Sequence, residues 1–170
     1  ATTDVIQVFR AQLRTETVAV QIGQIVSQCR TITAGDVTRL WAHARAIAGT
    51  VIDVDSSAGG AMMVSGVGRN SNANRLYWQR RTGNLSAQSR LGTTINGTAT
   101  ISDSFVVPDG QALMVTEVYS TVRPFVFSAG LIGSVLPATI YGTTLFLTRA
   151  PEPTTLLTAP STSTTPECTA

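Results

Sequence analysis

The chain has 170 residues, of which 43% are hydrophobic, and this length suits one domain with a buried core but is short for two. Twelve basic side chains, all of them Arg, against ten acidic ones leave a formal charge of +2, so the charge predicts no strong attraction to nucleic acid or acidic lipid. No run of eighteen apolar residues is present, so we expect no membrane-spanning helix in these residues. The first residues lack the features of a signal peptide, and we expect the chain to be part of a longer one.

The first predicted element is a long helix over residues 4–29. Apolar residues recur there at helical spacing and the stretch contains no Pro, as in an amphipathic helix. The apolar pattern shifts sideways between Leu13 and Val18, so we expect the first half to pack against a different partner from the second half, or against nothing within this chain. The apolar positions are Ile6, Phe9, Leu13, Val18, Ile22, Ile25 and Cys29.

A second, shorter helix is predicted over residues 34–48. Thr33 and Asp36 form the Ser/Thr-x-x-acid signature of a helix start, and Gly49 supplies the end. The apolar residues between them share one face, so we expect this helix to pack on the sheet that follows.

After Gly49 the hydrophobic period changes from helical to alternating, which is typical of strands. Four strands are predicted, and with the two helices they define an α+β fold in which a four-stranded antiparallel meander spans residues 61–149. In the second strand, alternation places Leu76 and Trp78 on one face and Tyr77 on the other. The predicted strands are residues 61–69, 74–81, 111–122 and 140–149.

Three segments lie outside these elements. Residues 92–109 are rich in Thr and Ser and are predicted as a long connection that contains a short strand. Residues 124–137 are apolar and bounded by Pro, so they form either a short buried helix or an exposed apolar loop. Residues 153–170 are a Pro-, Thr- and Ser-rich tail that would be loose without an anchor. We therefore expect a single domain over residues 1–152, followed by this tail.

The two cysteines, Cys29 and Cys168, lie near opposite ends of the chain. An even count in a polar, Thr-rich sequence without Lys favours a disulfide and an oxidising compartment, whereas two unrelated thiols are the alternative. A bond would close a loop of roughly 140 residues and contribute ~5 kcal/mol in the chain-entropy account. It would also anchor the tail.

Residues that carry catalytic or metal chemistry are sparse. His43 is the single histidine, so neither a hydrolase triad nor a zinc site can be assembled, and a Cys29 and His43 thiolate pair has no reason to converge. Asp53, Asp55 and Ser57 match the start of a calcium loop, but the Gly and the Glu that such a loop requires are missing. No cofactor or metal is therefore predicted.

Glu117 stands in the middle of the third predicted strand, where a carboxylate is unexpected. It would act as a catalytic acid or base only if a second titratable group converged on it, and the sequence predicts none. We interpret Glu117 as a buried structural carboxylate that pairs with one of the Arg side chains.

Four blocks of the sequence stand out together, namely residues 14–49, 62–84, 110–127 and 141–152. They resemble the successive blocks of TadE/TadF-like minor pilins, or pseudopilins, of the tight-adherence pilus, which is a type IVc pilus. The resemblance covers roughly residues 10–152. Its more specific parts are Trp78 followed by Arg80, and the run Glu117-Val118-Tyr119 with a Pro five residues after the Tyr. The blocks are RTETVAVQIGQIVSQCRTITAGDVTRLWAHARAIAG, MMVSGVGRNSNANRLYWQRRTGN, GQALMVTEVYSTVRPFVF and YGTTLFLTRAPE.

The resemblance implies a pilin-like plan, in which a long N-terminal helix carries a four-stranded antiparallel sheet. It also implies that an apolar continuation of that helix lies in the inner membrane before assembly, with the domain in the periplasm or in the extracellular pilus. The implied role is that of a non-enzymatic subunit in the assembly, initiation or tip of an adhesive pilus. Its partners would be other pilins and the inner-membrane assembly platform.

Two surfaces are the predicted sites of action for such a subunit, namely the first helix and the apolar segment 124–133, because exposed contiguous apolar area usually marks a partner. The alternative hypothesis is a ligand-binding module for glycan or nucleic acid on a strand face with Arg75, Tyr77 and Arg81, although the net charge argues against nucleic acid. The predicted interface residues are Phe9, Leu13, Phe125, Phe127 and Leu131.

Overall fold

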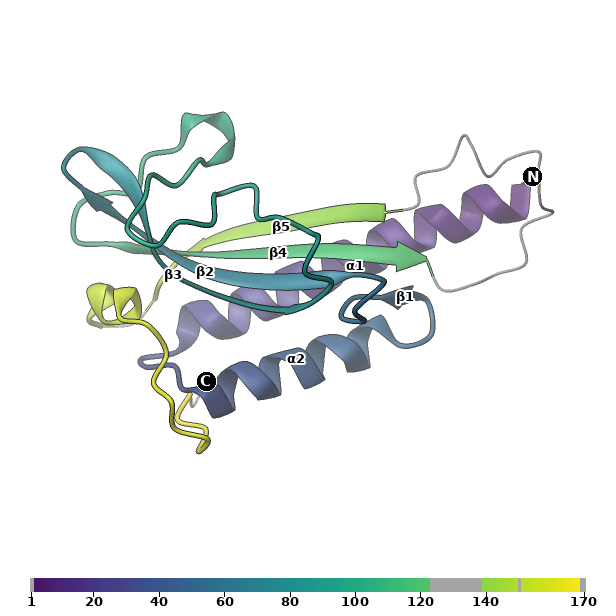
Figure 1. Ribbon diagram of the computed structural model, residues 1–170, viewed down its shortest axis with the longest axis horizontal. Coiled ribbons are helices and arrows are strands. Elements are labelled where there is room, and N and C mark those ends of the chain that lie inside the picture. The colour runs from purple at the N-terminus through teal and green to yellow at the C-terminus, as the bar shows by residue number, and fades with distance from the viewer. Residues whose placement is uncertain (1, 123–138, 150, 169–170) are drawn as a thin grey trace.

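The computed structural model describes residues 2–122, 139–149 and 151–168. Within these residues two helices are followed by an antiparallel sheet, so the predicted α+β class is confirmed (Figure 1). Helix α1 spans Thr2–Gln28 and helix α2 spans Ala34–Ala48. Both lie close to their predicted bounds, because helical periodicity and helix capping are local signals.

Helix α2 begins at the predicted capping box. The hydroxyl of Thr33 accepts a hydrogen bond from the backbone N–H of Asp36 (3.1 Å), and the Asp36 carboxylate accepts one from the backbone N–H of Thr33 (2.9 Å). The helix ends at Gly49, whose φ of 56° is a conformation that favours glycine.

The sheet has five strands among the described residues, one more than predicted. The four long strands correspond to the predicted ones, and the additional two-residue strand β1 pairs with the end of β4. The strands are β1 (Ile52–Asp53), β2 (Ala61–Asn70), β3 (Ala73–Gly83), β4 (Ala112–Val122) and β5 (Thr139–Leu147).

The strand order is not that of a meander, so this part of the prediction is wrong. Strand β4 pairs with β2 on one side and with β5 on the other, which leaves β3 at the edge beside β2. The long strands therefore lie in the order β3, β2, β4, β5. Residues 84–111, called here the connection, lead from β3 to β4 and include a short 3-10 helix, η1 (Ser102–Ser104).

Both faces of the sheet are covered (Figure 1). Helices α1 and α2 pack on one face, called here the helix face, and form the main hydrophobic core with it. The connection packs on the opposite face, called here the outer face, where it adds four residues to a second hydrophobic cluster. Those residues are Leu91, Ala99, Ile101 and Val107.

A β-bulge in β3 changes which side chains share a face. Gly66 pairs with Trp78 and Val67 pairs with Leu76, so Tyr77 is an extra residue in β3. As a result Leu76 belongs to the outer cluster, whereas Trp78 belongs to the helix-face core and Tyr77 packs against it. The prediction that Leu76 and Trp78 share a face is wrong, because one inserted residue reverses the alternation after it.

The C-terminal residues are packed onto the domain. A short 3-10 helix, η2 (Pro153–Leu157), places Leu156 in the core with 1% of its surface exposed. The indole N–H of Trp78 donates a hydrogen bond to the carbonyl of Leu156 (2.7 Å). The sequence predicted a tail that would be loose without an anchor, and η2 holds this segment in addition to the predicted disulfide.

Candidate functional site

Helix α1 divides into a packed half and an exposed half. Its C-terminal half lies on the helix face of the sheet, where Val18, Ile22 and Val26 are fully buried. Figure 1 shows that the N-terminal end of α1 extends past the ends of β4 and β5. Four large apolar side chains in the N-terminal half of α1 are more than half exposed, and we call them the α1 stripe: Val5 (56% exposed), Ile6 (53%), Phe9 (62%) and Leu13 (51%).

The α1 stripe lies along one side of the helix. Phe9 is four residues from both Val5 and Leu13, and side chains at this spacing are neighbours on a helix surface. Ala11 and Thr15 lie on the opposite, sheet-facing side and are fully buried. The sideways shift of the apolar pattern therefore corresponds to a change from an exposed face to a buried one. A surface of this kind offers apolar contact area to a partner and carries no catalytic group.

Of the predicted interface residues, only Phe9 and Leu13 can be placed, and both belong to the α1 stripe. Sequence reasoning did not assign Val5 and Ile6 to an interface, because periodicity alone does not distinguish an exposed apolar residue from a buried one. The other predicted interface residues lie outside the described part of the chain. They are Phe125, Phe127 and Leu131.

Glu117 is fully buried on β4, where three donors surround its carboxylate. The hydroxyl of Ser89 donates to Oε1, while the backbone N–H of Arg90 (2.9 Å) and the hydroxyl of Tyr141 (2.8 Å) donate to Oε2. The predicted ion pair with an Arg is wrong within the described residues. Arg90 contributes its backbone N–H, and its guanidinium instead lies over the ring of Tyr141, 3.7 Å from the centroid.

The Glu117 carboxylate joins three segments of the chain, since its donors come from the connection and from β5 while Glu117 itself lies on β4. Burial raises the pKa of Tyr141 well above its ordinary value near 10, and the charge of Glu117 raises it further. The phenol therefore stays protonated and keeps donating. The described donors to Glu117 are a hydroxyl, a phenol and a backbone amide, and none of these groups loses its proton near neutral pH. This geometry supports a structural carboxylate.

The face predicted for ligand binding is not assembled. Arg81 is paired with Met63, which is itself paired with Glu117, so Arg81 shares the outer face with Glu117. Its guanidinium donates to two backbone carbonyls of the connection, at 2.8 and 2.7 Å. Tyr77 packs instead against the helix-face core beside Trp78, because it is itself the extra residue of the bulge. The guanidinium of Arg75 donates to a backbone carbonyl of the connection at 3.5 Å.

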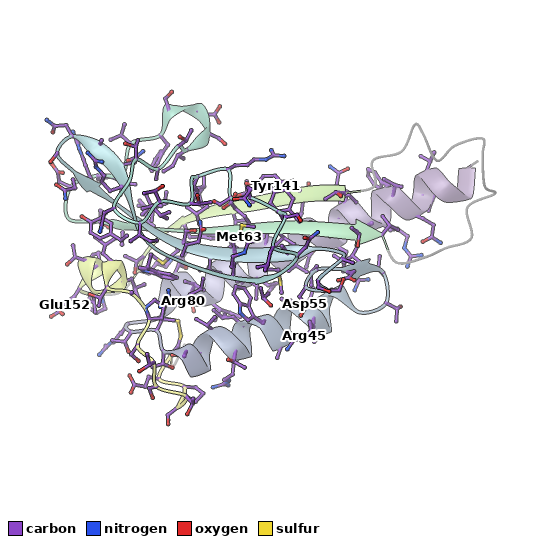
Figure 2. All side chains as sticks on the ribbon, viewed as in Figure 1. Arg45, Asp55, Met63, Arg80, Tyr141 and Glu152 are labelled. Atoms are coloured by element: carbon purple, nitrogen blue, oxygen red, sulfur yellow. A yellow bond between two sulfur atoms is a disulfide. The ribbon has the colours of Figure 1, made fainter. Side chains whose placement is uncertain are left out.

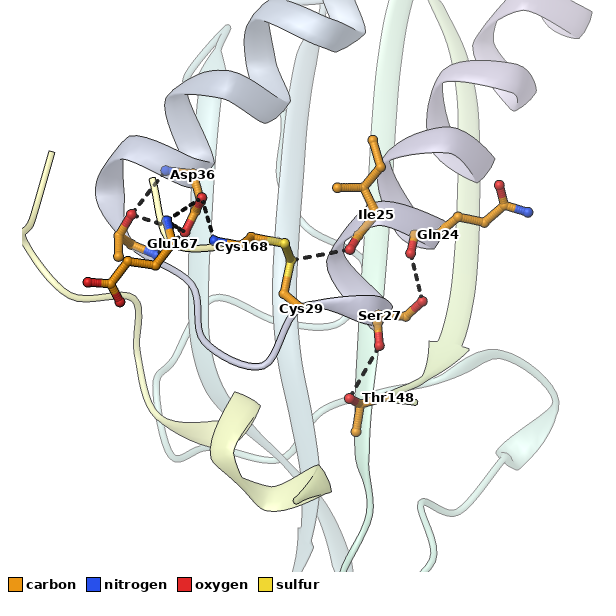
Figure 3. Close-up of a disulfide and its surroundings, with 9 residues drawn as sticks. Gln24, Ile25, Ser27, Cys29, Asp36, Thr148, Glu167 and Cys168 are labelled. Atoms are coloured by element: carbon orange, nitrogen blue, oxygen red, sulfur yellow. Dashed lines mark hydrogen bonds between the residues drawn. A yellow bond between two sulfur atoms is a disulfide. The ribbon is translucent and has the colours of Figure 1, made fainter. Parts of the chain in front are cut away.

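Cys29 and Cys168 form the predicted disulfide, which joins residues 139 positions apart in the sequence (Figure 3). The bond excludes a thiolate pair between Cys29 and His43. His43 instead lies exposed on α2, at the edge of a cavity of about 780 Å³ between α1 and α2 that the disulfide also lines.

The residues before Cys168 cap helix α2. The backbone N–H groups of Ala34 and Gly35 donate to the carbonyls of Ser161 (2.9 Å) and Ser163 (3.0 Å), which satisfies donors that a helix start leaves free. A Cβ at position 35 would collide with the carbonyl of Thr164, so glycine is what lets the tail approach this closely.

Asp36 also receives the tail. Its carboxylate accepts hydrogen bonds from the backbone N–H groups of Glu167 and Cys168, both at 3.0 Å, in addition to those from Thr33 (Figure 3). Burial acts to raise the pKa of Asp36, but the hydrogen bonds from Cys168, Thr33 and Glu167 outweigh it and lower the pKa. The disulfide, the capping hydrogen bonds and Asp36 together hold the C-terminal residues at the start of α2.

The sequence match to a calcium loop does not form a metal site. Asp55 pairs with Arg45 at 2.6 Å (Figure 2), and Asp53 accepts hydrogen bonds from the backbone N–H groups of Asp55 and Ser56. Among the described residues, no group of three or more His, Cys, Asp or Glu side chains is placed to hold a metal ion.

A comparison with protein-family models, with curated proteins and with solved structures finds no match to this chain. The resemblance to minor pilins therefore stays a prediction. In the described part of the chain, neither helix combines the length and the apolar character needed to cross a bilayer.

Proposed function

We propose that this chain is a non-enzymatic subunit of a surface filament, namely the ectodomain of a TadE/TadF-like minor pilin that acts in assembly, initiation or the tip of an adhesive pilus. The observation that carries the proposal is the division of α1. Its C-terminal half packs on an antiparallel sheet, and its N-terminal half, whose end extends past β4 and β5 (Figure 1), presents the exposed α1 stripe. This arrangement suits a pilin-like subunit, because one part of its helix must pack in its own core while another part contacts neighbouring subunits.

The partner that fits the α1 stripe is an apolar helix of another pilin or of the inner-membrane assembly platform. Arg10 is the one charged residue between Val5 and Leu13, so the contact would depend on apolar area and little on charge. In this proposal the domain faces the periplasm, where an oxidising environment maintains the Cys29 and Cys168 bond. Adhesion to a surface would follow from assembly of the filament.

Several internal contacts favour this role over an enzyme or a ligand-binding module. Glu117 has its carboxylate bonded to donors inside the protein. Arg45 and Arg81 are likewise engaged within the domain, which leaves them less available to a phosphate or glycan. The predicted ligand face is also divided by the bulge at Tyr77.

Genetic complementation tests the proposal in a bacterium that encodes this chain. Deletion of the gene should abolish surface filaments, and the native gene should restore them. A Phe9→Ala, Leu13→Ala variant should be exported and folded but should not restore filaments, whereas the matched variant Leu85→Ala, which truncates a Leu that is 75% exposed on the connection, should restore them. Normal filaments and normal adhesion in the deletion strain would contradict the proposal.

A further inference from the structure

Strand β5 forms one edge of the sheet in the described part of the chain. It pairs with β4 along its whole length, from Thr139 opposite Thr121 to Leu147 opposite Leu113, and with no other strand in the described residues. The opposite edge is partly occupied, because Arg75 of β3 forms a bridge with Thr98 of the connection. The backbone N–H of Leu76 also donates to the carbonyl of Gly97 (3.0 Å) there.

The sequence of β5 contains none of the features that normally protect an edge strand. Such strands usually carry Lys, Pro, a bulge or inward-pointing charges, which prevent another strand from pairing with them. The nine residues of β5, TIYGTTLFL, include no charged residue and no Pro, and their register with β4 is uninterrupted. Alternate N–H and C=O groups of β5 therefore point away from β4, where a further strand can bind them.

The residues of β5 are also complementary to a second β5 that runs in the opposite direction. If Thr143 is placed opposite Thr143 of the other copy, Tyr141 faces Leu145 on the outer face and Ile140 faces Phe146 on the helix face. Pairs of aromatic with aliphatic residues and of Thr with Thr are favourable across strands, and no like charges meet. Leu145 and Leu147, which are 40% and 39% exposed, would lose exposed area in this pairing.

We propose that two copies of this chain associate through β5, antiparallel and centred on Thr143, to form one continuous sheet of eight long strands. The interface is isologous, because each β5 presents the same residues to the other around a two-fold axis. This surface differs from the α1 stripe, and the inference does not depend on the proposed role in a filament.

Cysteine cross-linking tests the register. The Thr143→Cys and Thr139→Cys variants differ only in the position of one thiol on the same face of β5, and the native cysteines are protected in their disulfide. In the proposed register the two introduced cysteines of the Thr143→Cys dimer lie directly opposite each other, with their Cβ atoms about 5 Å apart. The two introduced thiols of a Thr139→Cys dimer would be ~27 Å apart, which is about eight residues of strand. A short thiol-reactive cross-linker should therefore join Thr143→Cys into dimers and leave Thr139→Cys monomeric.

Both variants are made on the Phe9→Ala, Leu13→Ala background, so that association through the α1 stripe does not contribute. Adding Leu145→Lys to Thr143→Cys should lower the yield of dimer at least about tenfold, since it places a charge in the strand pair. The matched change Ile95→Lys, at a residue 48% exposed on the connection, should leave the yield unchanged. Thermal unfolding of each variant checks that the fold is retained.

Three results obtained with the purified protein would overturn the inference. They are equal cross-linking of Thr139→Cys and Thr143→Cys, dimers that Leu145→Lys does not reduce, and a monomer at every concentration in sedimentation of the parent protein. Cross-linking of Thr143→Cys in cells to a different polypeptide alone would also overturn it. If the β5 dimer does not form but filaments are intact, only the inference fails and the proposed function is unaffected. If the β5 dimer forms but the chain has no role in filaments, only the proposed function fails.

Discussion

The phenol of Tyr141 on β5 donates a hydrogen bond of 2.8 Å to the buried carboxylate of Glu117 on the neighbouring strand β4. The carboxylate is fully buried, so each of its donors contributes to stability. A buried charged acceptor that loses a hydrogen-bond donor still carries the free-energy cost of its removal from water. Glu117 thus ties β5 and the connection to the centre of the sheet.

Tyr141→Phe should lower the free energy of unfolding by about 1 to 3 kcal/mol, because it leaves the buried charge with one donor fewer. The matched control is Tyr119→Phe, which removes a hydroxyl that donates to the exposed carbonyl of Gln88 (2.8 Å) and should cost less. Urea denaturation of both variants measures the difference. Equal losses would show that Glu117 does not depend on Tyr141.

The burial of Tyr141 and its contact with Glu117 together predict a loss of stability at alkaline pH. The pKa of Tyr141 is raised in the folded state above the value near 10 of an unfolded tyrosine, so the folded protein holds this proton more tightly. Its contribution to stability is fully present below about pH 10 and is lost as the pH rises above 10. A difference absorbance titration between the native protein and Tyr141→Phe should give a pKa well above 10. A difference curve centred near 10 would contradict the account.

Removal of the disulfide should destabilise the domain strongly. The bond closes a loop of 139 residues, and Cys168→Ser should lower the free energy of unfolding by ~5 kcal/mol in the chain-entropy account. Guanidinium denaturation of the variant, compared with the oxidised and reduced native protein, measures this loss. A variant as stable as the oxidised protein would show that the capping bonds at α2 hold the tail without the disulfide.

The two halves of α1 should respond differently to truncation. Ile22 is fully buried, so Ile22→Ala should cost about 2 to 4 kcal/mol of stability. Phe9→Ala and Leu13→Ala truncate side chains that are more than half exposed and should change stability by no more than about 0.5 kcal/mol each. Thermal or urea unfolding separates the two cases. A large loss at Phe9 would mean that the α1 stripe packs within the domain.

Local signals predicted the elements of this fold well. The capping box at Thr33 and the stop at Gly49 gave the bounds of α2, and alternation gave the four long strands. Strand order was missed because alternation identifies a strand and not its neighbours. The bulge at Tyr77 was missed because it follows from the pairing of β2 with β3, which no single strand reveals.

The candidate site was predictable in part. Periodicity gave Phe9 and Leu13, and the cysteine count together with the tail gave the disulfide. The donors to Glu117 were missed because two of them come from the connection, whose path over the outer face is set by tertiary packing. Tyr141 did carry a signal, since alternation places it on one face of β5, but only the register between strands brings it to Glu117.

The central claim, that the α1 stripe binds another subunit, is tested most directly by site-specific photo-cross-linking in cells that assemble the filament. A photoreactive amino acid at Phe9 should cross-link the protein to another pilin or to the assembly platform, which mass spectrometry of the product would identify. The same group at Leu85, which is 75% exposed on the connection, should give at least about tenfold less of that product if apolar contact at the stripe holds the complex. Equal products from the two positions, or no pilus component cross-linked at Phe9, would contradict the account.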